Sequence, residues 1–150
     1  MRAMSDEAKR ERIEAIYRKS KRSFPRIADL TAAELQGRPA EEKIVVVDVR
    51  SPEEQAVSMI DGAITSREFE ARLEAYEGAT VVAYCTMGHR SGLYVEELQG
   101  RGWTALNLVG AILAWTHVGG ALVDGDGPTR MLHVWGRQYN LAAEGYEAVW

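Results

Sequence analysis

The 150-residue chain, with 46% hydrophobic residues, 27% charged residues and a formal net charge of −4, has the length and composition of one globular domain. This composition excludes an intrinsically disordered, collagen-like or low-complexity chain, and no stretch approaches the ~20 apolar residues of a membrane span. The single cysteine, Cys85, can form neither an intramolecular disulfide nor a four-thiolate metal site, so a reducing compartment is favoured and the cytoplasm is the expected location.

The charge is concentrated at the N-terminus. Residues 1–26 hold nine basic and four acidic side chains, a net charge of +5, which leaves −9 for the rest of the chain. Such an arm could contact nucleic acid, an anionic membrane or an acidic partner. The i,i+4 pairs Asp6/Arg10 and Glu14/Arg18 instead describe a solvated helix, which is the interpretation we favour. The segment lacks the apolar run of a secretory signal, and its acidic residues argue against a transit peptide.

Helical segments are predicted first along the chain. Residues 5–22 are prone to form a helix that is only weakly amphipathic. Thr31, followed three residues later by Glu34, forms a capping box at the start of a short helix, and Gly37 closes that helix.

Two β-branched runs predict a parallel sheet. Ile44–Val49 is typical of a strand buried on both faces, and Ser51-Pro52 supplies the N-cap and first-turn proline of the helix that follows. The second run, Ala79–Tyr84, ends at Cys85. Between and after these runs we predict a short strand at Ala63–Ile64, a helix at Ser66–Tyr76, a helix at Ser91–Gln99, a strand at Trp103–Val109, a helix from about Ala111 to His117, and a loop over 119–128. The alternation predicts an α/β fold with a mostly parallel sheet and helices on both faces.

The C-terminal segment has an aromatic pattern. At ~100° per residue, Trp135, Tyr139, Tyr146 and Trp150 fall on one face of a helix, although Gly136 and Gly145 would weaken it. We favour packing of this face against its own domain. A partner or homodimer surface, or a flap over the site described next, remain alternatives.

The residues after the second strand suggest a reactive site. In the segment Val81–Gly92, Cys85 follows the carboxyl end of a buried strand, and a helix begins a few residues later. Open α/β sheets bind their ligands at the carboxyl ends of their strands. If residues 86–91 form a compact loop, their amides can point inward as an anion-binding nest, which would favour the thiolate of Cys85 over the thiol. Arg90 at a helix start opposes the helix dipole, which favours an anionic partner. His89 is expected at the loop rim, either tuning substrate or as an ordinary surface residue.

Other residues have a structural interpretation. Asp48 and Arg50 lie where the first strand ends and could form ion pairs that fix the loops around the site. Trp103 and Trp115 have aliphatic neighbours and are expected to anchor the core. His117 and His133 lack ligand spacing, so no metal site is expected.

The joint pattern resembles the rhodanese (sulfurtransferase) family over about residues 28–123. Cys85-Thr86-Met87-Gly88-His89-Arg90-Ser91 is similar to the family's Cys-x-x-Gly-x-Arg-Ser active loop, Asp48-Val49-Arg50 to its strand end, and Leu108-x-Gly110-x-Ile112-x-x-Trp115 to the segment after the active-site helix. The sequence differs at Ser58–Ala63, where the family often has Gly-His-Ile-x-Gly-Ala, and at Ala111, which replaces a frequent second glycine.

The resemblance implies a division into a basic helical extension (1–26), a rhodanese-like domain (27–127) and an aromatic helical extension (128–150). It implies a sulfurtransferase that moves a sulfane sulfur from a donor such as thiosulfate to cyanide or a thiol through a Cys85 persulfide, with no other cofactor. Cys85 and Arg90 would be catalytic, and Asp48 and Arg50 would support the loop. The substrate-binding residues would be Thr86, Met87, Gly88, His89 and Ser91.

Two alternatives remain at this point. A rhodanese-like fold can serve as a sulfur carrier or docking module for a protein partner, with no role expected for membranes or nucleic acid. Phosphatase or arsenate reductase chemistry is the weaker alternative, because the related cell-cycle phosphatases use Cys-x5-Arg, whereas Cys85 and Arg90 are separated by four residues.

Overall fold

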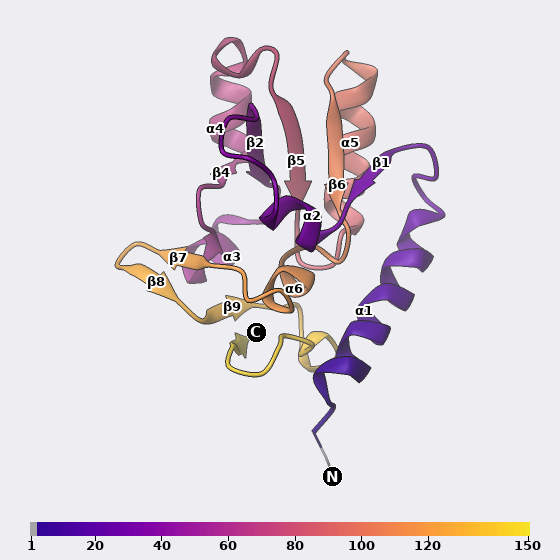
Figure 1. Ribbon diagram of the computed structural model, residues 1–150, viewed down its shortest axis with the longest axis vertical. Helices are drawn as coiled ribbons and strands as arrows, with labels where there is room; N and C mark the ends of the chain where they lie inside the picture. Colours follow the sequence, from indigo (N-terminus) through magenta and orange to yellow (C-terminus); the bar gives the residue numbers. More distant parts are fainter. Residues whose placement is uncertain (1–2) are drawn as a thin grey trace.

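A parallel sheet forms the centre of the protein (Figure 1). The computed structural model describes residues 3–150, and all four strand pairings in the five-stranded sheet are parallel, in the order β1-β6-β5-β2-β4. The strands are β1 (Ala28–Leu30), β2 (Ile44–Asp48), β4 (Ile64–Thr65), β5 (Thr80–Tyr84) and β6 (Ala105–Leu108). The predicted parallel sheet is therefore confirmed. Strand β1 was not predicted from the sequence, because this three-residue edge strand contains no β-branched run.

Helices connect these strands at the predicted places. They are α2 (Ala32–Gln36), α3 (Pro52–Val57), α4 (Ser66–Ala71), α5 (His89–Gly100) and α6 (Ala111–Thr116). The capping box of Thr31 and Glu34 is present, and the Ser51 side chain caps α3. The helix predicted over 66–76 breaks at Arg72, whose backbone is not helical, and continues as the 3-10 turn η1 (Leu73–Tyr76).

The sheet has a core on each face. Val82 and Tyr84 of β5 pack in one core with α6 and α2, whereas Val81 and Ala83 pack in the other with α4 and α5. This alternation follows from the two-residue period of a strand. Helices on both faces are thus confirmed.

The basic N-terminal segment forms the predicted helix, α1 (Asp6–Lys21). Its Ile13 side chain is buried in one core and its Tyr17 side chain in the other. Lys9 Nζ donates to the Ala142 carbonyl over 2.8 Å, so α1 is tied to the C-terminal segment. Arg2, counted in the basic arm, lies outside the described residues. No helix within residues 3–150 has the length and hydropathy needed to cross a membrane.

The predicted C-terminal helix is wrong. The segment instead contains β9 (Met131–His133), the 3-10 turn η2 (Arg137–Tyr139) and β10 (Glu147–Val149), with β9 and β10 paired in parallel. Gly145 has a φ of +94°, which a right-handed helix cannot contain. Long-range pairing of Met131 with Glu147 therefore overrides the helical spacing of the aromatic residues.

The aromatic residues consequently do not share one helical face. Tyr146 is half-buried and donates its hydroxyl to the Gly120 carbonyl over 2.7 Å, whereas Trp135 and Trp150 are each 58% exposed. The predicted loop over 119–128 contains a hairpin of β7 (Leu122–Asp124) and β8 (Gly127–Thr129), and β3 (Met59–Ile60) pairs with β7.

Candidate active site

The Cys85 thiol lies at the carboxyl end of the central strand β5. Its side chain is buried, with 2% of its surface exposed, at the floor of a cavity of about 340 Å³. The cavity is lined by Cys85, Thr86, Met87, His89, Arg90, Trp135 and Tyr139. Trp135 and Tyr139 come from the C-terminal segment, so this segment forms part of the cavity wall.

Two groups contact the sulfur directly. The Gly88 amide donates to Cys85 Sγ over 3.1 Å, and the Ser91 hydroxyl lies 3.4 Å from it. Gly88 has a φ of +115°, in the region that favours glycine, and α5 begins at the next residue. The sulfur therefore faces the N-terminus of a twelve-residue helix, where the helix dipole stabilises negative charge.

Three carbonyls of the loop accept hydrogen bonds from neighbouring elements. Amides at the start of α6 donate to them, from Ile112 to the Cys85 carbonyl over 3.2 Å and from Leu113 to that of Thr86 over 3.5 Å. Asn107 Nδ2 donates to the Gly88 carbonyl over 2.9 Å. With the carbonyls engaged elsewhere, the positive ends of the loop dipoles are left for the sulfur side.

Arg90 is paired with a buried carboxylate. Its Nη1 and Nη2 atoms donate to the two oxygens of Glu54, each over 3.0 Å, and Nη2 also donates to the Thr86 hydroxyl over 3.2 Å. The guanidinium lies 5.0 Å from the Trp135 ring centre. Glu54 was not predicted as a site residue. In the sequence it reads only as an acidic residue in the first turn of a helix, and no local pattern connects it to Arg90.

The expected ion pair between Asp48 and Arg50 is present and fully buried. Arg50 Nη2 donates to Asp48 Oδ2 over 2.8 Å and to the Ser58 carbonyl over 2.6 Å. Tyr84 donates its hydroxyl to the same carboxylate, and burial together with the Asp48 charge raises the pKa of Tyr84 well above its ordinary value. This network joins the ends of β2 and β5 to the Ser58–Ala63 segment, one of the two places where the chain departs from the family pattern.

The helix α1 supports the loop from the opposite side. Tyr17 donates its hydroxyl to Asp29 Oδ1 over 2.6 Å and accepts a hydrogen bond from Asn107 Nδ2 over 2.9 Å. The same Asn107 amide holds the Gly88 carbonyl. Neither Tyr17 nor Asn107 was identified from the sequence, because their roles depend on contacts across 90 residues.

Removing the Tyr17 hydroxyl is expected to change how stability depends on pH. Burial, with a smaller effect of Asp29, raises the pKa of Tyr17 above its ordinary value of 10.0. Above pH 10 the Tyr17 hydroxyl loses its proton in the unfolded chain but keeps it in the folded protein. The free energy of unfolding therefore falls with rising pH, by up to ~1.4 kcal/mol per pH unit for this one group. Tyr17→Phe should reduce this slope and cost ~1–2 kcal/mol at neutral pH, because Asn107 loses an acceptor. Urea unfolding on both sides of pH 10 measures both effects, and an unchanged slope would contradict the assignment.

The remaining residues singled out in the sequence have structural surroundings. Trp115 is 8% exposed and its indole donates to the Ala121 carbonyl over 3.0 Å, while Trp103 packs edge-on against Phe69, so both act as core anchors. The His117 ring lies 2.8 Å from the Leu141 carbonyl. His89 is exposed at the rim of the cavity, as expected.

Comparison with known proteins matches this arrangement to one family. The model of the rhodanese-like domain matches residues 31–117, more than half of the chain. The uncharacterized protein slr1261 of Synechocystis sp. is 34% identical over 89 residues, which are 57% of this chain and 50% of that protein. The chain thus spans about half the length of this curated relative.

Solved structures share the fold. A thiosulfate sulfurtransferase from Pseudomonas aeruginosa has a TM-score of 0.61 at 21% identity, over 85% of this chain and 25% of that chain. A protein of unknown function from Rhodopseudomonas palustris, described as a possible tyrosine phosphatase, has a TM-score of 0.54 at 26% identity, over 72% of this chain and 91% of that chain. With its parallel sheet, its Cys85 loop and the match over residues 31–117, the chain belongs to the rhodanese-like family.

Proposed function

We propose that the protein is a sulfurtransferase that carries a sulfane sulfur on Cys85, between a donor such as thiosulfate and an acceptor such as cyanide or a thiol. The main support for this proposal is the surroundings of the Cys85 sulfur. The sulfur lies at the floor of an open cavity, 3.1 Å from the Gly88 amide and at the N-terminus of α5. The amide and the helix N-terminus place positive partial charge next to the sulfur, where the nucleophilic attack and the persulfide charge are proposed to develop.

The chemistry needs only the Cys85 thiolate and two substrates. The thiolate attacks the outer sulfur of thiosulfate, a bond forms between that sulfur and Cys85 Sγ, and sulfite leaves with the electron pair of the broken sulfur–sulfur bond. The acceptor then attacks the outer sulfur of the persulfide, and the electron pair returns to Cys85. Because the chain has no second cysteine, the acceptor comes from outside.

The loop residues have separate proposed roles. The amides of Thr86, Met87, His89, Arg90 and Ser91, which do not bond the Cys85 sulfur in the described structure, are the proposed donors to the outer sulfur and to the charge that develops there. Arg90 holds the loop through Thr86, and the buried pair of Asp48 and Arg50 fixes the strand ends below it.

The state of Arg90 argues against phosphate as the substrate. One similar structure is described as a possible tyrosine phosphatase, so a phosphatase or arsenate reductase is the weaker alternative. A phosphate group would need the two parallel N–H donors of the Arg90 guanidinium. These donors already bind the Glu54 carboxylate, whose side chain is only 4% exposed. Freeing Arg90 would leave the buried Glu54 carboxylate with only its 4.0 Å ion pair to Arg50 Nε, and the loss of two charge-assisted hydrogen bonds from a buried group is costly.

Thiosulfate treatment followed by intact-mass measurement tests the proposal. The expected result is a gain of one sulfur atom, its loss on addition of cyanide or a thiol, and no gain in protein whose thiol was first blocked with iodoacetamide. A protein that reacts with iodoacetamide but takes up no sulfur from thiosulfate would contradict the proposal. Turnover of an aryl phosphate, measured in parallel, would favour the phosphatase alternative.

A sulfur carrier for one protein partner would use the same persulfide. It would load with thiosulfate equally well but would discharge slowly to small acceptors. The rate of discharge from preloaded protein therefore separates this second possibility from a transferase that acts on small molecules.

A further inference from the structure

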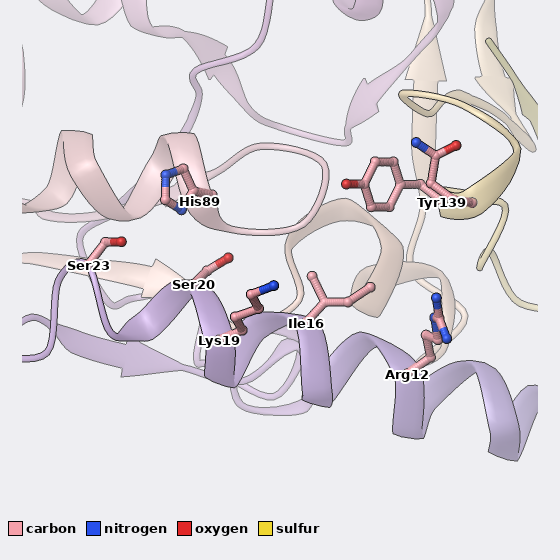
Figure 2. Close-up of a pocket in the computed structure, with 8 residues that line it drawn as sticks. Arg12, Ile16, Lys19, Ser20, Ser23, His89 and Tyr139 are labelled. Carbon is pink, nitrogen blue, oxygen red and sulfur yellow. The ribbon is translucent and has the colours of Figure 1, made fainter.

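A second cavity adjoins the Cys85 cavity, between α1 and η2 (Figure 2). Its volume is about 450 Å³. Its lining includes Arg12, Lys19, Ser20, His89, Gln138 and Tyr139. Figure 2 shows Lys19 and Ser20 rising from α1 into this space, with His89 and the Tyr139 hydroxyl facing it from the opposite side. His89 and Tyr139 line both cavities, so a molecule that reaches from one to the other contacts the same two side chains.

The permanent charges facing this cavity are all positive. Arg12 and Lys19 are exposed, and within residues 3–150 neither forms an ion pair shorter than 4.0 Å. No carboxylate lines the cavity in this part of the chain. By contrast, Arg90 in the neighbouring cavity is paired with Glu54.

The sequence of α1 explains why these two cations have no ion-pair partner among residues 3–150. Their neighbours three and four residues away on the helix are Ala8, Lys9, Ala15, Ile16, Arg22 and Ser23. None of these is acidic, so the helix provides neither Arg12 nor Lys19 with the usual i,i+3 or i,i+4 carboxylate. Two other lysines of the same helix are neutralised, Lys9 by Asp6 and Lys21 by Asp29.

The uncharged groups of the lining suit the same kind of ligand. The hydroxyls of Ser20 and Tyr139 and the side-chain amide of Gln138 are hydrogen-bond donors. Two cations with several neutral donors and no acid form a set that suits an anionic group such as a carboxylate.

We propose that this cavity binds the carboxylate groups of the sulfur acceptor, and that the acceptor is a small thiol bearing one or more carboxylates. This inference rests on the proposed function, because it assigns the second substrate of the Cys85 site. The acceptor's acidic groups lie against Arg12 and Lys19, and its thiol extends past His89 and Tyr139 to the persulfide.

The transfer step balances without any further reactant. The acceptor thiolate attacks the outer sulfur of the persulfide and forms a new sulfur–sulfur bond. The bond between that outer sulfur and Cys85 Sγ breaks, and its electron pair restores the Cys85 thiolate. The products are the free enzyme and the persulfide of the acceptor.

Discharge of preloaded protein by two thiols of different charge tests the inference. Protein is first loaded with thiosulfate, and loading is confirmed by mass. The rate constant for discharge is then measured with mercaptosuccinate, which has two carboxylates, and with 2-mercaptoethanol, which has none. We expect the ratio of the two rate constants to fall about tenfold in Lys19→Glu and further in the double variant with Arg12→Glu. Because only the ratio is compared between proteins, differences in thiol reactivity between the two acceptors cancel.

The matched control is Arg18→Glu, which makes the same charge change at an exposed position of α1 that lines neither cavity. Its ratio should equal that of the wild type. If the ratio of rate constants fell equally in Arg18→Glu and Lys19→Glu, the preference would come from long-range attraction between the basic helix and the acidic thiol, and the proposed site would be overturned. A wild-type ratio that neither variant changes would overturn the inference but leave the proposed function standing, whereas failure to load would overturn the proposed function itself. If a peptide with a cysteine flanked by aspartates discharged the preloaded protein faster than 2-mercaptoethanol while mercaptosuccinate did not, the small-thiol inference would be overturned in favour of a protein acceptor.

Discussion

Replacing Cys85 with serine is expected to abolish persulfide formation and to lower sulfur transfer at least ~1,000-fold. The hydroxyl of serine is not ionised at neutral pH, so the Gly88 amide and the α5 N-terminus have no thiolate to stabilise. The site is buried and serine is close to cysteine in shape, so the loop should keep its conformation. The measurement is steady-state transfer from thiosulfate to cyanide, together with the intact mass after thiosulfate treatment.

Thermal unfolding is the control for Cys85→Ser. A midpoint within a few degrees of the wild type, with no transfer, would assign the loss to chemistry and not to misfolding. Transfer above about a hundredth of the wild-type rate would contradict the role of Cys85, because no other thiol is present to replace it.

Replacing Gly88 with alanine should affect both stability and activity. A Cβ at this position would lie 2.6 and 2.7 Å from ring carbons of Tyr17, and φ is +115°, which an L-residue with a side chain rarely adopts. Tyr17 cannot withdraw freely, because it is buried and bonded to Asp29 and Asn107. We expect a loss of ~3 kcal/mol or more in the free energy of unfolding. Transfer should fall at least ~100-fold, because the backbone donor to the Cys85 sulfur moves.

Gly100→Ala is the matched control for Gly88→Ala. Gly100 is the last residue of α5, has no heavy atom within 4 Å of an added Cβ, and lacks a positive φ. The control should lie within ~0.5 kcal/mol of the wild type. Tyr17→Leu combined with Gly88→Ala would relieve the ring overlap but not the backbone strain, so it separates the two costs. Wild-type stability and turnover in Gly88→Ala would show that the loop is not held as described.

Local patterns in the sequence were enough to predict the central strands and the loop between them. The β-branched runs Ile44–Val49 and Ala79–Tyr84 predict two buried strands, because such runs are stable only when both faces are covered, and the structure pairs these strands as β2 and β5. Thr31 and Ser51 predict helix starts because the effect of an N-cap is also local: its side chain accepts a hydrogen bond from an amide two or three residues away. The position of Cys85 at a strand end follows from these elements.

Contacts between distant residues could not be predicted in this way. Glu54 and Arg90 are 36 residues apart, and Tyr17 and Asn107 are 90 apart. The C-terminal helix was predicted from four aromatic residues with a helical period, but a period does not show that a helix forms when strand pairing competes. The left-handed φ of +51° at Ala111 was not predicted either, because alanine rarely adopts this conformation and nothing local in the sequence indicates it.

The reacting loop and the walls around it belong to different stretches of the chain. Cys85 falls inside the matched region 31–117, whereas Tyr17, Trp135 and Tyr139 fall outside it. The loop alone therefore does not set which molecules can approach Cys85 in this protein, because side chains from both flanks of the matched region line the cavities around it.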